Sequence, residues 1–252
     1  MDRILLSVPA RRRLLTSESF RVAMKSKIIH IICLLTLLSG HPVQSNGQPV
    51  NMEGQQSVPS NRNPSVIMVL GYNKKTGAHQ QATGFFMNQA GDVVTNYHAI
   101  AGVDGIKIWT TANEGFPVIK VGSVDIPGDL AILSVDIPSQ YVHPAIIASE
   151  LPTTGEAIEV IGHPLGHQQS SSKGIIASIF PAPKIESIIQ FTAPIAIGGS
   201  GSPLFNRSGQ VVGVASFILY LGVNKEPRYF AIPSSRLLML KNISSLALHP
   251  LL

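Results

Sequence analysis

Residues 80–99, QQATGFFMNQAGDVVTNYHA, contain two short β-type segments, Gln80–Met87 and Asp92–Asn96. Both are bounded by polar residues and glycine, which is typical of strands joined by short turns. Segments of this kind follow one another along most of the 252 residues, and they predict an all-β fold. The 22 glycines and 18 prolines argue against a helical bundle or a coiled coil.

Twelve β-type segments follow a polar, flexible lead-in at residues 46–64 and fall into two groups of six. The first group is Ser65–Gly71, Gln80–Met87, Asp92–Asn96, Gly105–Trp109, Phe116–Val124 and Leu130–Asp136. The second group is Ala157–Gly162, Gly174–Phe180, Ser187–Thr192, Ser202–Asn206, Gln210–Ile218 and Arg228–Pro233. We therefore predict two packed six-stranded antiparallel β-barrels, at about residues 65–136 and 156–233, in one domain of residues 65–245. A short C-terminal helix, which Ser234 or Ser235 begins, closes this domain.

The formal charge of +5 is concentrated at the N-terminus. Residues 1–45 contain seven basic and two acidic side chains, and the rest of the chain contains twelve of each. A body with no net charge and no basic stripe is a poor partner for a phosphate backbone, so we expect no nucleic-acid binding.

The N-terminal segment has the features of an export signal. Lys25 and Lys27 precede the apolar run Ile28–Leu38, which is too short to span a bilayer. We predict a signal peptide over about residues 24–45, cleaved near Ser45, and a periplasmic or secreted mature chain with no membrane span. An uncleaved signal anchor is the alternative.

Two residues of this segment have further consequences. Met24 stands directly before the signal, which makes residues 1–23 an upstream extension. Cys33 is the single cysteine and lies inside the apolar run, so the mature chain has no thiol. This excludes disulfides, cysteine nucleophiles and cysteine metal sites from the mature chain.

Three local patterns carry side chains suited to acyl transfer. His98 follows a strand segment, a position that holds an imidazole rigidly and leaves one nitrogen open. Asp129 begins a strongly apolar strand, where a partly buried carboxylate accepts a hydrogen bond from a histidine. Ser200 lies in the glycine-rich turn Gly198–Leu204, which points successive N–H groups to one side. Each pattern alone is more often structural, but their joint occurrence indicates a catalytic set.

On these motifs the chain resembles the trypsin-like serine peptidases, and within them the HtrA/Deg branch. The resemblance runs from about Ser65 to Leu237. It is carried by Thr95–His98, Asp129–Leu133, Ile161–Gly166, Gly198–Leu204, Gly209–Gly213 and Phe230–Pro233. It implies a chymotrypsin-like double barrel with the active site between the barrels. The 15 residues after Leu237 are too few for the PDZ module of many such proteases, so we expect the protease domain only.

The resemblance also implies a role for each catalytic candidate. His98 is the general base, Asp129 its orienting partner and Ser200 the nucleophile. The backbone N–H groups of Gly198 and Ser200 form the oxyanion hole.

The substrate-binding candidates follow from the same resemblance. Ser216, Phe217 and Ile218 form the edge strand that pairs with substrate, and Tyr229 closes the primary pocket. No acidic residue lies along the pocket walls, and Tyr229 replaces the glycine usual in this branch. We therefore expect a shallow apolar pocket that prefers small residues such as Ala or Val before the scissile bond.

Together these features predict an exported serine endopeptidase that hydrolyses unfolded or extended proteins. The expected reaction uses side chains alone, so we expect no cofactor and no metal. His163 and His167 are four residues apart, but Pro164 and Gly166 between them disfavour a helical metal site. A homo-oligomer remains open, since HtrA-like enzymes are often trimers.

Two departures from the family pattern keep a second class of function open. Gly199 stands where the family usually has Asp or Asn, and Ser202 stands where it usually has Gly. The alternative is a protease-like peptide-binding protein with a weak or conditionally assembled active site. An α/β-hydrolase is disfavoured for two reasons. Ser202 stands where the Gly-x-Ser-x-Gly motif requires its final glycine, and Asp129 and His98 precede the serine, whereas the acid and base of an α/β-hydrolase follow it.

Overall fold

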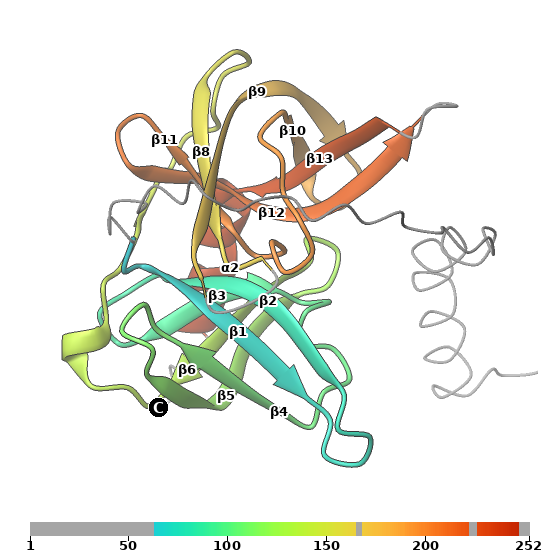
Figure 1. Ribbon diagram of the computed structural model, residues 1–252. Coiled ribbons are helices and arrows are strands. Elements are labelled where there is room, and N and C mark those ends of the chain that lie inside the picture. Colours follow the sequence, from blue (N-terminus) through green and yellow to red (C-terminus); the bar gives the residue numbers. More distant parts are fainter. Residues whose placement is uncertain (1–62, 165–167, 222–225, 247–252) are drawn as a thin grey trace, which may run out of the picture. The chain divides into compact units, whose positions relative to one another are not determined.

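A computed structural model describes residues 63–164, 168–221 and 226–246, which form two β-barrels and a closing helix (Figure 1). The two six-stranded antiparallel barrels predicted from the sequence are confirmed. The predicted signal peptide, residues 24–45, and nearly all of the polar lead-in lie outside the described residues. Within these residues, no helix is long and apolar enough to cross a membrane.

The first barrel is closed by antiparallel pairing in the order β1-β2-β3-β6-β5-β4, with β4 returning to β1. Its strands are β1 (Val66–Tyr72), β2 (His79–Phe86), β3 (Asp92–Asn96), β4 (Gly105–Trp109), β5 (Gly115–Asp125) and β6 (Leu130–Val135). The pairing of β3 with β6 brings the predicted positions of His98 and Asp129 to the same end of this barrel.

The second barrel has the order β11-β8-β9-β10-β13-β12 and is closed by pairing of β11 with β12. Its strands are β8 (Ala157–Gly162), β9 (Ser170–Ala182), β10 (Glu186–Phe191), β11 (Pro203–Asn206), β12 (Gln210–Leu221) and β13 (Glu226–Pro233). In the connection between the barrels lie a short 3-10 helix, η1 (Ser139–Tyr141), and a two-residue strand, β7 (Ile146–Ile147). β7 pairs in parallel with the start of β12, which the sequence did not predict.

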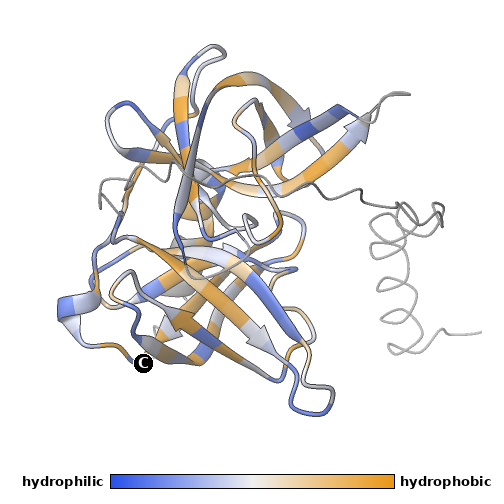
Figure 2. Cartoon of the chain, viewed as in Figure 1, coloured by the Kyte–Doolittle hydropathy of each residue, from blue (hydrophilic) through white to orange (hydrophobic). Residues whose placement is uncertain are grey.

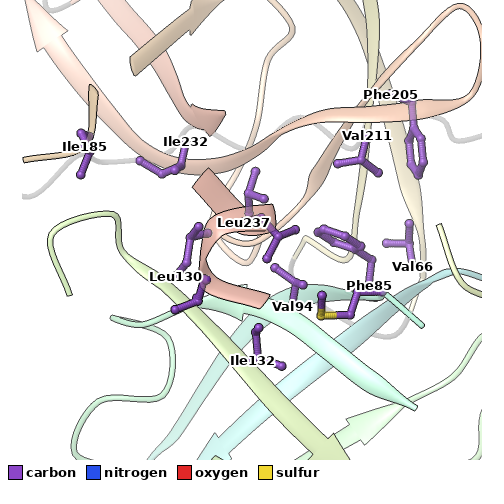
Figure 3. Packing of buried hydrophobic residues seen from close by; sticks show 13 residues of the cluster. Val66, Phe85, Val94, Leu130, Ile132, Ile185, Phe205, Val211, Ile232 and Leu237 are labelled. Carbon is purple, nitrogen blue, oxygen red and sulfur yellow. The ribbon is translucent and has the colours of Figure 1, made fainter. Parts of the chain in front are cut away.

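Strands that face the other barrel are buried on both sides. On β6, Ala131 and Leu133 point into the first barrel, while Leu130 and Ile132 point into a separate core between the barrels. This explains why β6 is continuously apolar rather than alternating. The core between the barrels is shown in Figure 3. It joins Val66, Phe85, Met87, Val94, Leu130 and Ile132 of the first barrel to Ile185, Phe205, Val211, Val214 and Ile232 of the second and to Leu237 and Leu240 of the helix.

The helix α2 (Ser234–Leu246) follows β13 directly and begins at Ser234, one of its two predicted first residues. Leu237 is fully buried between the barrels, and Ser234 donates its hydroxyl to the carbonyl of Ala148 at 2.9 Å. The helix therefore fixes the two barrels against each other, and with them the two halves of the candidate site.

Candidate active site

His98 and Asp129 extend from neighbouring strands of the first barrel. The Asp129 carboxylate accepts the main-chain N–H of His98 through Oδ1 at 2.9 Å, and its Oδ2 lies 2.7 Å from His98 Nδ1. Because an ionised carboxylate only accepts hydrogen bonds, this contact assigns the proton to Nδ1 of a neutral imidazole. Nε2 is then left as the acceptor, as a general base requires. The His98 side chain is 41% exposed, so it is accessible to substrate.

The backbone of Asp129 adopts a left-handed conformation with φ of +50°. This conformation is uncommon for residues other than glycine, although aspartate tolerates it better than most. Two hydrogen bonds to its carbonyl stabilise it here, one from the main-chain N–H of Tyr97 at 3.1 Å and one from the Asn96 side-chain amide at 3.0 Å. The end of β3 thus holds the Asp129 backbone as well as its side chain.

The turn that precedes Asp129 is fixed by a second carboxylate, that of Asp125. Its Oδ1 accepts the N–H of Gly128 at 3.1 Å, and both of its oxygens pair with the guanidinium of Arg236 on α2. Burial raises the pKa of Asp125, but the hydrogen bonds from Arg236 and Gly128 outweigh it, so that the pKa lies below its ordinary value. The hydrogen bond with Asp125 raises the pKa of Arg236 in turn. This ion pair ties the closing helix to the turn that carries Asp129.

Ser216 connects Asp129 to the second barrel. Its hydroxyl donates to Asp129 Oδ2 at 2.6 Å, so that this oxygen contacts both Ser216 and His98. Ser216 lies at a bulge, because Ala215 pairs with Ala231 and Phe217 pairs with Phe230, which leaves Ser216 without a partner on β13. A bulge redirects the side chain of its extra residue, and here it turns Ser216 toward the other barrel. The sequence predicted only a backbone role for Ser216, since nothing local marks the bulge.

Ser200 follows a tight turn in the second barrel. Gly199 N–H donates to Ala196 O at 2.9 Å, and Gly198 has a φ of +91°, which fits the third position of a type II turn. The N–H groups of Gly198 and Ser200 make no hydrogen bond with any described residue. Ile197, within this turn, has 81% of its surface exposed. Among the described residues, the turn therefore leaves two backbone donors without a partner, one on either side of Gly199, as is expected of an oxyanion hole.

Thr83, on β2 of the first barrel, binds this turn through two hydrogen bonds. Its N–H donates to Ser200 O and its hydroxyl donates to Gly198 O, each at 2.8 Å. The same hydroxyl accepts the N–H of His163 at 2.9 Å, and the Thr83 carbonyl accepts the Thr95 hydroxyl at 2.7 Å. Thr83 is fully buried, so each of these bonds is formed away from solvent. Sequence analysis did not identify Thr83, whose partner Gly198 is 115 residues away.

The Ser200 hydroxyl itself points toward β12. It donates to the carbonyl of Ser216 at 3.5 Å, at the outer limit of a hydrogen bond. Ser200 and His98 form no hydrogen bond in this structure, whereas the predicted histidine–aspartate contact is present. The three predicted catalytic residues thus gather around Ser216, with the serine turned away from the imidazole. Hydrogen bonds between catalytic groups are often long or poorly aligned in structures without substrate.

Both departures from the family pattern are accommodated by their surroundings. A Cβ at Gly199 would lie 2.9 Å from Ala196 O, the carbonyl that closes the turn, so this turn favours glycine. Ser202 is 1% exposed, and its hydroxyl fills the space where a Cβ at Gly162 would lie. Ser202 is therefore compensated by a glycine on β8, while Gly199 alters the nucleophile turn itself.

Two residues predicted to border the primary pocket, Tyr229 and Phe217, pack against other aromatic rings. The ring centroids of Tyr229 and Phe191 lie 5.8 Å apart, and Phe217 stacks on Phe230 at 4.9 Å. Glu226, the acidic side chain nearest in sequence, is 63% exposed and pairs with Arg228 at 3.2 Å. The predicted pocket residues Phe217 and Tyr229 therefore pack against aromatic rings, and Glu226 is engaged in an exposed ion pair.

Metal-ligating side chains do not cluster in the part of the chain that the structure describes: no group of three His, Cys, Asp or Glu is present there. His163 is buried, with Nε2 3.4 Å from the carbonyl of Val66, and His167 lies outside the described residues.

The family model for the trypsin-like peptidase domain matches residues 82–214, more than half of the chain. The chain belongs to this family. The trypsin-like domain is also similar to HtrA and DegP proteins. A probable periplasmic DegP-like serine endoprotease of Rhizobium meliloti is 31% identical over 160 residues, covering 62% of this chain and 31% of the relative. Serine protease HTRA1A of Danio rerio is 28% identical, covering 66% of this chain and 35% of the relative. The chain spans about a third of the length of these relatives.

Solved structures share the same architecture. A serine endoprotease from Yersinia pestis is 25% identical to the trypsin-like domain, with a TM-score of 0.60 over 71% of this chain and 62% of the other. A protease from M. tuberculosis in its active form has a TM-score of 0.61 at 24% identity, over 72% of this chain and 81% of the other, a likeness of fold alone. The double barrel is thus a fold that this chain shares with solved proteases.

Proposed function

We propose that this chain is a serine endopeptidase with His98, Asp129 and Ser200 as its catalytic triad. One observation carries the proposal. A single carboxylate oxygen of Asp129 contacts His98 Nδ1 at 2.7 Å and the Ser216 hydroxyl at 2.6 Å, beside a serine whose turn leaves two N–H groups without a partner among the described residues. The family and the names of its relatives add support, because those relatives are called serine proteases.

In the proposed reaction, Ser200 first rotates from the Ser216 carbonyl to His98 Nε2, a change between staggered rotamers. His98 takes the hydroxyl proton as the serine attacks the peptide carbonyl, and later gives it to the leaving amine. Asp129 keeps the proton on Nδ1 during attack and stabilises the imidazolium that forms. Water then releases the acyl group by the same steps.

The negative charge on the tetrahedral oxygen is stabilised by the N–H groups of Gly198 and Ser200. Neither group has another partner among the described residues, so neither must break a bond first. Loss of one such donor typically costs about 10²–10³ in rate.

The direct test of the reaction is hydrolysis of an unfolded protein such as a fluorescent casein by the full chain. Wild type should cleave it, and Ser200→Ala should not, while the free energy of unfolding stays nearly unchanged because only one oxygen is lost. A Ser202→Ala variant removes a neighbouring hydroxyl and should retain cleavage. Turnover by the Ser200→Ala variant would refute the assignment of the nucleophile.

Substrates are proposed to be unfolded or extended proteins that pair along Ser216, Phe217 and Ile218. Tyr229 narrows the primary pocket, since its ring packs against Phe191. We therefore propose a preference for Ala or Val before the scissile bond, with modest discrimination. The aromatic rings that pack on Tyr229 and Phe217 support this preference over one for Lys or Arg.

Export to the periplasm or to the outside of the cell completes the proposal. It rests on the predicted signal peptide, residues 24–45, and on relatives named as periplasmic.

A protease-like peptide-binding protein is the second candidate. Two observations favour it: Gly199 in the nucleophile turn, and a Ser200 hydroxyl that contacts Ser216 instead of His98. Binding of a peptide by wild type without any turnover, in the assay above, would select this candidate.

A further inference from the structure

The closing helix carries a charged side chain that pairs with the first barrel. Arg236 lies in the first turn of α2, and its guanidinium donates to both carboxylate oxygens of Asp125, at the end of β5. Figure 2 shows hydrophobic residues along most strands of both barrels and hydrophilic residues mainly in the loops. The Asp125 side chain, which is 8% exposed, is an exception to this pattern, and Arg236 supplies its counter-charge.

This ion pair packs directly on the peptide unit that precedes Asp129. Asp125 Oδ1 accepts the N–H of Gly128 at 3.1 Å. A Cβ at Gly128 would lie 2.3 Å from Asp125 Oδ2 and 3.5 Å from Arg236 Cγ, so both side chains lie against the Gly128 backbone. The N–H of Asp129 closes the same turn by donating to the carbonyl of Ile126 at 3.3 Å. The backbone position at which Asp129 begins is therefore set by contacts that include the closing helix.

Asp129 is consequently held from both of its neighbouring peptide units. Its carbonyl is bound by Asn96 and Tyr97 at the end of β3, and its N–H side is fixed by the turn that Asp125 holds. Its φ of +50° is uncommon for a residue other than glycine. Such a conformation persists where the surrounding structure over-determines it. The direction of the Asp129 side chain therefore depends on both sets of contacts.

We propose that Arg236 and Asp125 are positioning residues for the reaction, because they hold Asp129 where its carboxylate contacts His98 Nδ1. The catalytic roles of Asp129 and His98 rest on the proposed function. Arg236 acts through the carboxylate of Asp125 and the N–H of Gly128, and its own guanidinium pairs with Asp125. A small displacement of a reacting group lowers the rate strongly, so loss of this support should be visible in kcat.

Arg236 also responds to the second barrel. The hydrogen bond with Asp125 raises the pKa of Arg236, burial opposes it, and attraction to Asp125 and to Glu186 of β10 raises it further. Arg236 thus joins the closing helix to β5 through a hydrogen-bonded pair and to β10 through charge. These carboxylates come from the two barrels that α2 packs between, so the position of α2 is transmitted to the Asp129 turn through Arg236.

The tautomer of His98 tests this positioning without any turnover. In the full chain carrying Ser200→Ala, nitrogen NMR of labelled histidine at about pH 8 should show His98 with its proton on Nδ1. His98→Gln assigns the signals by removing them. Arg236→Met keeps an aliphatic stem but no guanidinium, and it should convert part of the His98 population to the Nε2–H tautomer. Arg236→Lys keeps a cation beside Asp125 and should retain the Nδ1–H form. An identical tautomer in wild type and Arg236→Met would overturn the proposal.

Steady-state kinetics of the same substitutions, made in the chain with Ser200 intact, separate positioning from general stability. Arg236→Met should lower kcat by about tenfold with KM within about twofold, and Arg236→Lys should stay within about threefold of wild type. Ser234→Ala is the matched control, because it removes another hydrogen bond of α2, the one to the carbonyl of Ala148. It should lower the midpoint of urea unfolding and leave kcat and the His98 tautomer unchanged.

Equal losses of kcat in Ser234→Ala and Arg236→Met would mean that the helix has only a structural role, and would overturn the proposal. The tautomer measurement decides the proposal even if wild type does not cleave. That failure would count against the proposed function alone.

Discussion

The two barrels hold their halves of the candidate site by different means. In the first barrel, His98 and Asp129 are positioned by direct side-chain hydrogen bonds across two paired strands. In the second barrel, Ser200 lies in a turn that contains glycines with positive φ. This turn is held mainly by hydrogen bonds that its main-chain carbonyl groups accept. Two of those carbonyls are bound by Thr83, which belongs to the first barrel. The base half, His98 and Asp129, is therefore fixed mainly within the first barrel, with added contacts from Ser216 and, through Asp125, from Arg236. The nucleophile half, the Ser200 turn, depends more strongly on how the barrels pack.

The largest effect is expected where the nucleophile half is most crowded, at Gly201. Its φ is +85°, and an added Cβ would lie 2.0 Å from the carbonyl of Thr83. Gly201→Ala should displace the Ser200 turn, reduce kcat/KM by more than about 10²-fold and destabilise the fold by about 2–4 kcal/mol. Peptide hydrolysis and urea unfolding measure the two effects.

Gly209→Ala is the matched control. Gly209 also has a positive φ, +74°, but an added Cβ there meets nothing within 4 Å. It should cost about 1 kcal/mol from backbone strain and leave kcat/KM unchanged. If the two variants behaved alike, the contact with Thr83 would have no role in shaping the turn.

Removing the Thr83 hydroxyl should weaken the connection between the first barrel and the Ser200 turn of the second. Thr83→Val keeps the shape but leaves Gly198 O and the N–H of His163 without this partner. We expect kcat to fall by about 10- to 10²-fold with KM within about twofold, because the oxyanion donors lose their fixed orientation. Thr83→Ser should restore kcat. Steady-state kinetics on a peptide substrate supply the comparison.

Thr95→Val controls for the general cost of losing a buried hydroxyl. Thr95 donates to the carbonyl of Thr83 but contacts no carbonyl of the nucleophile turn. It should lower the free energy of unfolding by a similar amount and leave kcat within about threefold. A fall in kcat as large as that of Thr83→Val would show that the effect is merely structural.

The base half can be tested through the ion pair that supports its turn. Asp125→Asn should destabilise the fold by about 1–3 kcal/mol at pH 7, because the side chain is 8% exposed and bonded to Arg236. The pKa of Asp125 is lower in the folded chain than its ordinary value. Its stabilising contribution is therefore complete above about pH 4 and is lost as the pH falls through the folded-state pKa.

Urea unfolding of wild type and Asp125→Asn at pH 7 and pH 3 measures this contribution. The difference between the two proteins should shrink at the lower pH. Glu226→Gln breaks an exposed ion pair with Arg228 and should change stability by no more than about 0.5 kcal/mol. If the difference in the free energy of unfolding grew at pH 3, the pKa of Asp125 would have to be raised, not lowered, in the folded chain.

The smallest effect is expected from a substitution in the proposed primary pocket, because neither the His98–Asp129 pair nor the Ser200 turn is held by the pocket residues. Tyr229→Gly removes the ring that packs on Phe191. Acceptance should broaden toward Leu, Met and Phe before the scissile bond by about tenfold relative to Ala. Profiling the cleavage products of an unfolded protein measures this ratio. A marked preference for Arg or Lys, or no change, would mean that Tyr229 does not border the pocket.

Local patterns in the sequence were enough to predict the two barrels and to select His98, Asp129 and Ser200. The predicted strands of five to nine residues and the glycine-rich turns depend on neighbouring residues in the sequence, so they can be recognised without a structure. The hydrogen bonds from Thr83 to the Ser200 turn and the contact of Ser216 with Asp129 could not be predicted. They join residues 115 and 87 positions apart, and they depend on barrel packing and on a one-residue bulge.

The central claim is that the two barrels bring one serine and one histidine together as a nucleophile and its base. Labelling of the full chain with a fluorophosphonate, followed by mass spectrometry of its peptides, tests this claim directly. The account predicts modification of Ser200 alone among the serines of the chain, and loss of that modification in His98→Gln. Modification of another serine in place of Ser200, or equal labelling without His98, would contradict it.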